Sequence, residues 1–280
     1  MTLILAATPL GNPGDASSRL KSAIENATII AAEDSRRFHR LCQDIEVTFT
    51  GKVLSFFEGN EEERTKELLT ELKSGATVLV VSDAGMPTIS DPGFRLMREA
   101  IAENFEVLVI PGPSAVTMAV ALSGLPTDRF SFEGFPPRTA GARASAFEKL
   151  RFEERTMVFF EAPHRLKESL IDAVEVFGSE RKAAICREMT KRYEETIRGT
   201  LTELLSWANV NEVLGEITLV IAGAEVDSAL RTADEMVKRV KEFEAAGMDR
   251  TGAIATVADE FGISKRLVYA AVVDANKMSQ

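Results

Sequence analysis

The sequence predicts an α/β protein of two domains, the first of which contains a parallel sheet with helices on both faces. Three short apolar runs, residues 3–7, 76–81 and 107–110, have the length and the β-branched content of buried parallel strands. Segments with apolar residues at helical spacing alternate with such runs. The chain has 280 residues, of which 45% are hydrophobic, so it can form two cores.

Strand and helix patterns alternate through the first 123 residues. Asp15 and Asn60 are candidate N-caps, and Gly75 is a candidate helix terminator. We expect strands at residues 3–7, 28–32, 52–55, 76–81 and 107–110, with helices that end at residue 26 or span 36–43, 61–74, 94–104 and 114–123.

The segment Leu122–Asp128 is the predicted domain boundary. It gives domains of residues 1–123 and 124–227 and a C-terminal extension of 228–280. The second domain is less regular, and we expect a mixed sheet there. Its predicted strands are residues 156–160, 181–186, 196–199 and 216–222. Its predicted helices are residues 164–177 and 200–207.

Residues 228–280 have the pattern of a small helical unit, with helices expected at 230–246, 249–261 and 265–276. The connection Phe261-Gly262-Ile263 between the last two resembles that of a helix-turn-helix. Small helical hairpins are common, so this pattern leaves both a nucleic-acid role and a purely structural role open.

The loop Ser82–Gly93 follows a predicted strand and precedes a predicted helix. Gly85 and Gly93 allow close approach of the backbone to a ligand, and two prolines stiffen the loop. Similar loops follow the strands that end at residues 7 and 110, and α/β proteins bind ligands where such strand ends meet. The glycine-rich dinucleotide and phosphate motifs are absent from the sequence, which leaves a backbone-lined pocket for an uncharged or zwitterionic adenosyl ligand open.

The formal net charge of −10 is unusual for a nucleic-acid-binding protein, although phosphate contacts need only a local basic patch. Basic residues gather at 36–40, 138–155, 187–198 and 265–266, which either solvated helix faces or one basic cleft would explain. The two cysteines and two histidines lack metal-binding spacing, so we expect no metal site. Because no apolar run approaches a membrane span, we expect a cytoplasmic protein without membrane contact.

Seven segments carry a further signal: Thr8–Asp15, Ala32–Arg36, Ser82–Gly93, Pro111–Ala115, Glu161–Arg165, Arg187–Lys191 and Gly215–Ile221. In this order they resemble the tetrapyrrole-methylase superfamily, and within it the branch that methylates small-subunit ribosomal RNA. The resemblance implies a two-domain fold with S-adenosylmethionine bound between the domains. It also implies transfer of the methyl group to the ribose 2′-hydroxyl of a cytidine in the decoding region of 16S rRNA.

The resemblance assigns residues and partners as well. It implies a homodimer that acts on 16S rRNA within the 30S subunit. Cofactor binding is expected from Pro9, Gly11, Asp83, Ala84, Gly85, Pro87, Ser90, Pro111, Gly112, Ser114 and Ala115. RNA binding is expected from Arg36, Arg37, Arg165, Arg187, Lys265 and Arg266.

The loop Glu161–Arg165 lies where a strand gives way to a helix, and Pro163 forces an extended approach. We interpret it as the wall of the site on the side of the methyl acceptor. The catalytic candidates are Glu161, His164 and Lys191. A hydroxyl is a poor nucleophile, so a general base would help, and the sequence leaves it open among His164, Glu33, Asp34, Glu188 and Lys191.

Two other functions are compatible with parts of the sequence. One is a methyltransferase of the same superfamily that acts on a porphyrinogen, a precorrin or a diphthine-type substrate; the basic residues 36–40 and the helical C-terminus argue against it. The other is a catalytically silent RNA- or nucleotide-binding module, against which the intact loop 82–93 argues. The phenylalanines at 56–57 and 159–160 lie in apolar strands and are expected in the core rather than as stacking platforms for bases.

Overall fold

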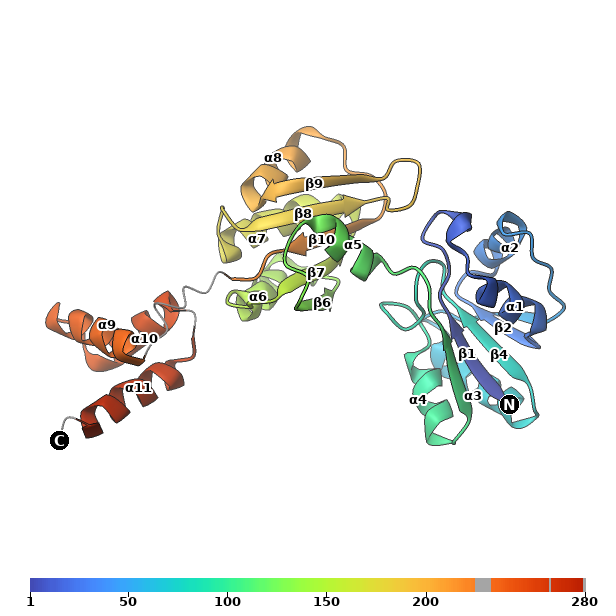
Figure 1. Ribbon diagram of the computed structural model, residues 1–280, viewed down its shortest axis with the longest axis horizontal. Helices are drawn as coiled ribbons and strands as arrows, with labels where there is room; N and C mark the ends of the chain where they lie inside the picture. The colour runs from blue at the N-terminus through green and yellow to red at the C-terminus, as the bar shows by residue number, and fades with distance from the viewer. Residues whose placement is uncertain (225–232, 262, 279–280) are drawn as a thin grey trace.

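The computed structural model describes residues 1–224, 233–261 and 263–278. Within these residues, two five-stranded sheets, each packed against helices, follow one another along the chain, and three helices come after the second sheet (Figure 1). This confirms the predicted two-domain α/β fold with a helical extension. Within the described residues, no helix has the length and apolarity needed to cross a membrane.

The first sheet is entirely parallel, as predicted. Its strand order is β3-β2-β4-β1-β5. The last residue of β1, Ala6, lies opposite both Val81 and Ile110, the last residues of its neighbours. The loops after these strands therefore leave the sheet at one edge. The strands are β1 (Thr2–Ala6), β2 (Ile29–Ala32), β3 (Lys52–Ser55), β4 (Thr77–Val81) and β5 (Glu106–Ile110).

Helices cover both faces of this sheet, which explains why its central strands are almost continuously apolar. Leu5, Leu68 and Leu96 belong to the core on one face. Ile24 and Phe38 belong to the core on the other face. The helices are α1 (Ser18–Asn26), α2 (Ser35–Asp44), α3 (Glu61–Lys73) and α4 (Phe94–Ala102).

Two predicted helix caps are wrong in detail. Asp15 lies in a short 3-10 turn, Pro13–Asp15, and Ser17 instead caps α1, since its hydroxyl oxygen accepts a hydrogen bond from the backbone N–H of Leu20 at 3.0 Å. Asn60 precedes α3 as expected, but its amide bonds the chain before it rather than the helix. Both helices nevertheless lie where the apolar periodicity predicts them.

The second sheet is mixed, as predicted, in the order β6-β7-β10-β8-β9. β6 and β7 are parallel, and the other neighbours are antiparallel. The strands are β6 (Phe130–Gly134), β7 (Thr156–Glu161), β8 (Lys182–Arg187), β9 (Glu195–Thr200) and β10 (Ile217–Ile221). Three helices pack against one face: α6 (Ala140–Leu150), α7 (Leu166–Phe177) and α8 (Leu201–Val210).

Strand β6 and helix α6 are missing from the sequence-based prediction. β6 is an edge strand without a fully buried residue, and its register with β7 shifts before Gly134. In α6 the buried position 143 is an arginine, whose Nε donates to the carboxylate of Asp172 in α7 at 2.6 Å. A charged residue at a core position disguises the apolar periodicity by which a helix is recognised.

Helix α5 (Ala115–Ser123) packs on the opposite face of the second sheet. Val116 and Val120 lie in one core with Val158 of β7 and Val220 of β10. The predicted boundary at residues 123 and 124 assigns α5 to the first domain, whereas this packing favours a division ahead of α5. The boundary itself stays a prediction.

The last three helices have an apolar core of their own, which includes Val240, Val257 and Val268. They are α9 (Ala233–Ala245), α10 (Arg250–Glu260) and α11 (Lys265–Met278). The predicted turn at Gly262 and the predicted boundary between residues 227 and 228 lie outside the described residues.

Candidate functional site

A cleft of about 460 Å³, here called the inner cleft, lies between the two domains at the carboxyl edge of the first sheet. The chain up to α5 contributes Leu10, Glu33, Arg37, Asp83, Ala84, Ser90, Asp91 and Ala115. The second domain contributes Phe135, Phe160, Glu161, Ala162, Pro163, Met189 and Gly215–Thr218. The strand-end loops therefore meet where the sequence predicts a ligand site.

Two backbone hydrogen bonds join the loops that follow β1 and β4. The N–H of Thr8 donates to the carbonyl of Gly85 at 2.8 Å, and the N–H of Gly85 donates back to Thr8 at 3.1 Å. The Thr8 hydroxyl also donates to the carbonyl of Ser82 at 3.2 Å. Gly85 has a φ of +80°, and a Cβ there would lie 3.3 Å from Leu10, so this position favours glycine.

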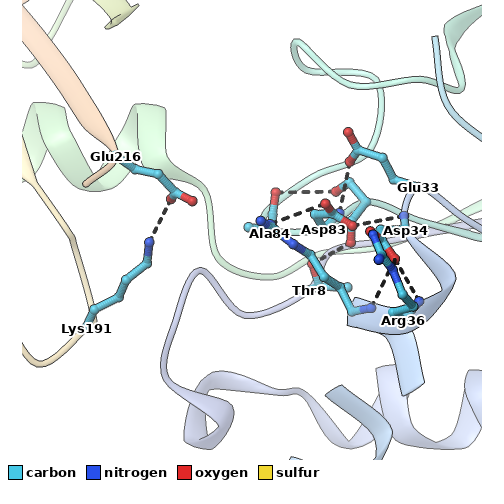
Figure 2. Close-up of polar contacts among 10 residues, drawn as sticks. Thr8, Glu33, Asp34, Arg36, Asp83, Ala84, Lys191 and Glu216 are labelled. Carbon is cyan, nitrogen blue, oxygen red and sulfur yellow. Dashed lines mark hydrogen bonds and ion pairs between the residues drawn. The ribbon is translucent and has the colours of Figure 1, made fainter. Parts of the chain in front are cut away.

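Carboxylates follow β2 and β4 and hold each other in place through the backbone. The N–H of Asp83 donates to Glu33 at 3.0 Å, and the N–H of Asp34 donates to Asp83 at 3.0 Å (Figure 2). Arg37 of α2 lies 3.3 Å from the second carboxylate oxygen of Asp83. The segment that enters α2 and the loop after β4 thus form one hydrogen-bonded, acidic wall.

Burial disfavours the ionised form of the carboxyls in this wall. Burial raises the pKa of Glu33 and that of Asp83 above their usual values. Burial also raises the pKa of Asp91 to about 7, and the negative charge of Glu33 adds to the shift. A cation placed in the inner cleft would favour the ionised forms, so the wall is suited to a positively charged ligand.

Asp34 and Arg36 bind each other and do not line the inner cleft. The Asp34 carboxylate caps α2 by accepting the N–H of Arg36 at 2.8 Å, and it also binds the guanidinium of that residue at 2.8 Å (Figure 2). The bond from the Arg36 side chain lowers the pKa of Asp34 to about 2. Asp34 is therefore a poor general base, while the Arg36 side chain, 90% exposed, can still reach a phosphate.

The Lys191 side chain packs against Gly11 of the first domain, and its ammonium is paired within the second domain rather than facing the inner cleft as a free amine. Its ammonium lies 2.9 Å from Glu188. It also lies 3.1 Å from Glu216 (Figure 2). Burial alone would lower the pKa of Lys191, but its bonds to these two carboxylates outweigh that and raise it. Lys191 thus stays protonated, which argues against it as a proton acceptor. A Cβ at Gly11 would overlap the Lys191 side chain, so this glycine makes room for it.

The buried carboxylate of Glu161 is bound by neighbouring groups of the second domain. Its carboxylate accepts the hydroxyl of Ser169 and the backbone N–H of Ala162, and it lies 3.5 Å from the guanidinium of Arg165. That guanidinium in turn donates to the carbonyl of Pro136 at 2.7 Å. Glu161 and Arg165 therefore hold the wall together, which argues against the predicted catalytic role of the first and RNA contact of the second.

A larger cavity of about 1160 Å³, here called the outer cavity, adjoins the inner cleft. Glu33, Ser90, Asp91, Phe135 and Ala162 line both spaces. The outer cavity is also bordered by Glu58, Glu61, Arg138, His164 and Arg165. The predicted catalytic residue His164 is exposed at this cavity and does not line the inner cleft.

The predicted cofactor residues divide into two groups. Asp83, Ala84, Ser90 and Ala115 line the inner cleft. Gly85 and Ser114 line a side pocket of about 60 Å³ next to it, together with Leu10, Ala84, Met86, Ile89, Asp91, Ala115, Val116 and Phe160. The other five border neither space: Pro9, Gly11, Pro87, Pro111 and Gly112.

The predicted RNA contacts also differ in their surroundings. Arg37 is exposed at the inner cleft, and Lys265 and Arg266 are exposed at the start of α11. Arg187 is mostly covered, and its guanidinium binds Glu195 at 2.8 Å and the carbonyl of Leu214 at 3.3 Å. An RNA phosphate would have to compete with these partners of Arg187.

Sequence reasoning missed Asp91 and Phe135 and placed Phe160 in the core. Asp91 belongs to the loop 82–93, which the sequence predicts as a ligand loop. The position of Asp91 in the sequence does not reveal that it lies at the junction of the cavities. Phe135 follows the unpredicted strand β6 and is 54% exposed. Phe160 is partly buried and lines the cleft, and Phe57 is 46% exposed instead of in the core, whereas Phe56 and Phe159 are in the core as expected.

A family model described as Tetrapyrrole (Corrin/Porphyrin) Methylases matches residues 2–205. The chain belongs to the tetrapyrrole methylase family. A Mycobacterium tuberculosis protein named Ribosomal RNA small subunit methyltransferase I is 48% identical over 276 residues, which are 98% of this chain and 95% of that protein. A Thermotoga maritima protein of the same name is 44% identical over 223 residues, 80% of this chain but 99% of that protein.

A solved structure of this methylase fold is that of a uroporphyrin-III C-methyl transferase from Thermus thermophilus, complexed with S-adenyl homocysteine. It superposes with a TM-score of 0.55 and 14% identity, and the match covers 78% of this chain and 96% of that one. At this identity the likeness supports the fold of the two domains.

Replacing Asp91 by asparagine should stabilise the folded protein at alkaline pH. A carboxyl with a pKa of about 7 in the folded state and about 4 in the unfolded state contributes stability below pH 4 that is lost as the pH rises through 7. We therefore expect the free energy of unfolding of Asp91→Asn, relative to the wild type, to be about 1 to 2 kcal/mol higher at pH 8 than at pH 5, with allowance for solvent screening.

Urea denaturation at the two pH values measures this difference. Asp128→Asn, at an exposed aspartate, serves as the control and should change the free energy of unfolding by the same small amount at both pH values. A gain for Asp91→Asn that is equal at pH 5 and pH 8 would contradict the raised pKa.

Proposed function

We propose that this chain is an S-adenosylmethionine-dependent methyltransferase that modifies the ribose 2′-hydroxyl of a cytidine in the decoding region of 16S rRNA. The proposal rests mainly on the acidic, backbone-lined inner cleft together with the 48% identity to a protein named for small-subunit rRNA methylation. The particular nucleotide comes from the resemblance of the motifs. The alternative substrates are a tetrapyrrole or a diphthine-type substrate.

The residues of the cleft fit the cofactor. Within the described part of the chain, Asp83 is paired with Arg37, whereas Glu33 and Asp91 form no ion pair. Their negative charge is therefore available to a sulfonium. The side pocket offers Leu10 and Ile89, among others, as apolar surface for an adenosine. When bound, S-adenosylmethionine supplies a methyl group that its sulfonium makes electrophilic.

Individual roles follow from these positions. Asp83 and Ala84 are proposed to border the charged end of the cofactor, and Gly85 and Ser114 the apolar end. The Thr8–Gly85 bonds keep the cleft wall in one geometry, so less freedom is lost when the ligand binds. Much of the rate acceleration in a methyl transfer of this kind comes from alignment of the two reactants.

The outer cavity is the proposed entry for the RNA nucleotide. Phe135 lies where this cavity joins the inner cleft, and an exposed aromatic ring can stack on a base. The segment that carries it is held by guanidinium groups, because Arg165 binds Pro136 and Arg143 binds the carbonyl of Arg138 at 3.4 Å. Arg138 and His164 on the same side can contact phosphate.

The C-terminal helices are a further proposed RNA contact. Lys265 and Arg266 are exposed at the start of α11, as a phosphate contact requires. The RNA contacts of residues 265 and 266 stay a prediction.

We also propose a homodimer. Strand β5 is at the edge of the first sheet, and its Leu108 and Val109 are 43% and 49% exposed. Phe94 and Ile101 of the adjacent helix α4 are exposed as well. An apolar surface beside an unpaired strand edge is typical of a surface that a second copy covers.

Methyl transfer from labelled S-adenosylmethionine tests the function. We expect label in 30S subunits, recovered after nuclease digestion as 2′-O-methylcytidine by mass spectrometry. Free 16S rRNA and uroporphyrinogen III are the comparison substrates and should accept far less label. Label in the tetrapyrrole, or on a base instead of a ribose, would contradict the proposal.

Phe135→Ala should reduce kcat/KM for 30S subunits about 5- to 150-fold, because stacking on one base contributes about 1 to 3 kcal/mol. The affinity for S-adenosylhomocysteine, measured by calorimetry, should change less than twofold. Phe152→Ala, which removes another exposed phenylalanine away from both cavities, is the matched control. Equal effects of the two variants on kcat/KM would remove Phe135 from the acceptor site.

Val109→Asp should convert the dimer to a monomer, because a charge at the centre of an apolar interface is left unpaired. Light scattering after gel filtration measures the mass. Val210→Asp, at an exposed valine of α8, should leave the mass unchanged. A monomeric wild type, or a dimeric Val109→Asp, would be evidence against this interface.

A further inference from the structure

Asp91 is the carboxyl at which the three spaces of the site meet. It lines the inner cleft, the outer cavity and the side pocket. Glu33 and Phe135 line two of them, and Glu161 lines one. A group that must touch both a bound cofactor and an incoming acceptor has to lie at such a junction.

The backbone on both sides of Asp91 is held in place. Thr88 and Ser90 have φ values of +79° and +61°, a conformation that residues other than glycine adopt only where the surroundings impose it. The N–H of Thr88 donates to the carbonyl of Pro92 at 3.2 Å, and the N–H of Gly93 donates to Glu61 at 2.9 Å. These bonds close the loop around Asp91 and fix where its side chain begins.

The other acidic groups at the inner cleft have structural tasks. Glu33 accepts the backbone N–H of Asp83, and Asp83 accepts that of Asp34 besides its pair with Arg37. Glu161 is bound by Ser169 and Arg165, and Glu216 is paired with Lys191. Among the described residues Asp91 forms no ion pair. A hydrogen bond with Ser82 is the one hydrogen bond among them that affects the pKa of Asp91.

We infer, on the basis of the function proposed above, that Asp91 is the catalytic residue that accepts the proton of the ribose 2′-hydroxyl. The O–H bond breaks and its proton goes to the Asp91 carboxylate. The oxygen forms a bond to the methyl carbon of S-adenosylmethionine. The bond from that carbon to sulfur breaks, and its electron pair stays on sulfur in S-adenosylhomocysteine. Asp91 then returns the proton to water.

The surroundings of Asp91 suit this task. Glu33 and Asp83 from the strand ends and Glu58 and Glu61 from the region of α3 are acidic, and Arg37, Arg138, His164 and Arg165 lie on the other sides of the cavities. Burial and the nearest carboxylates raise the pKa of Asp91, which makes it a stronger base than an exposed aspartate. A bound sulfonium lowers that pKa again and keeps the carboxylate ionised when the acceptor arrives.

The test compares Asp91→Asn and Asp91→Glu with the wild type on 30S subunits. We expect kcat to fall about 10²- to 10⁴-fold in Asp91→Asn, with partial recovery in Asp91→Glu. The wild-type rate should fall at acid pH as one group becomes protonated, and this dependence should disappear in Asp91→Asn. Asp128→Asn, at an exposed aspartate outside both cavities, is the control and should have the wild-type rate and pH profile.

Binding measurements separate this role from a structural one. Calorimetry should give affinities of Asp91→Asn for S-adenosylhomocysteine, a neutral thioether, within about threefold of the wild type, and 30S binding should be unchanged. If the wild type methylates RNA while Asp91→Asn keeps its kcat and pH profile, Asp91 is not the proton acceptor and the proposed function stands. If kcat falls only in proportion to lost S-adenosylhomocysteine affinity, Asp91 is a binding residue. A wild type that methylates no RNA would overturn both proposals.

Discussion

The two hydrogen bonds between Thr8 and Gly85 are the constraint on which the site depends. They join loops that are 77 positions apart in sequence, and they can form only because β1 and β4 are parallel neighbours that end in register. Once the loops are joined, Leu10, Asp83 and Ala84 face the same cleft. A side chain at position 85 would need a strained φ and would crowd Leu10. The sheet topology therefore brings the loops together, and the local sequence must supply a glycine at the point of contact.

The second domain completes the site through a different kind of contact. Helix α5 packs on the second sheet, so residues 111–114 link a loop of the first sheet to the core of the second. Lys191 reaches back across Gly11 and is held by Glu188 and Glu216.

Sequence patterns predicted what depends on local composition. The parallel sheet follows from apolar runs, and the ligand edge follows from the loop 82–93 between a strand and a helix. The patterns failed where tertiary contacts decide: β6 is an exposed edge strand, and α6 has the buried Arg143. The roles of Glu161, Lys191 and Asp91 depend on partners distant in sequence, such as Ser169 and Glu216, which no spacing rule reveals.

The raised pKa values in the acidic wall have a consequence for turnover. In the proposed reaction the cofactor is a cation and its product a neutral thioether, so the attraction from Glu33, Asp83 and Asp91 disappears when the methyl group leaves. The same cleft then binds the product less tightly than the cofactor. Product inhibition should therefore weaken as these carboxyls ionise, and the wall would act as a charge-dependent release mechanism that needs no moving part.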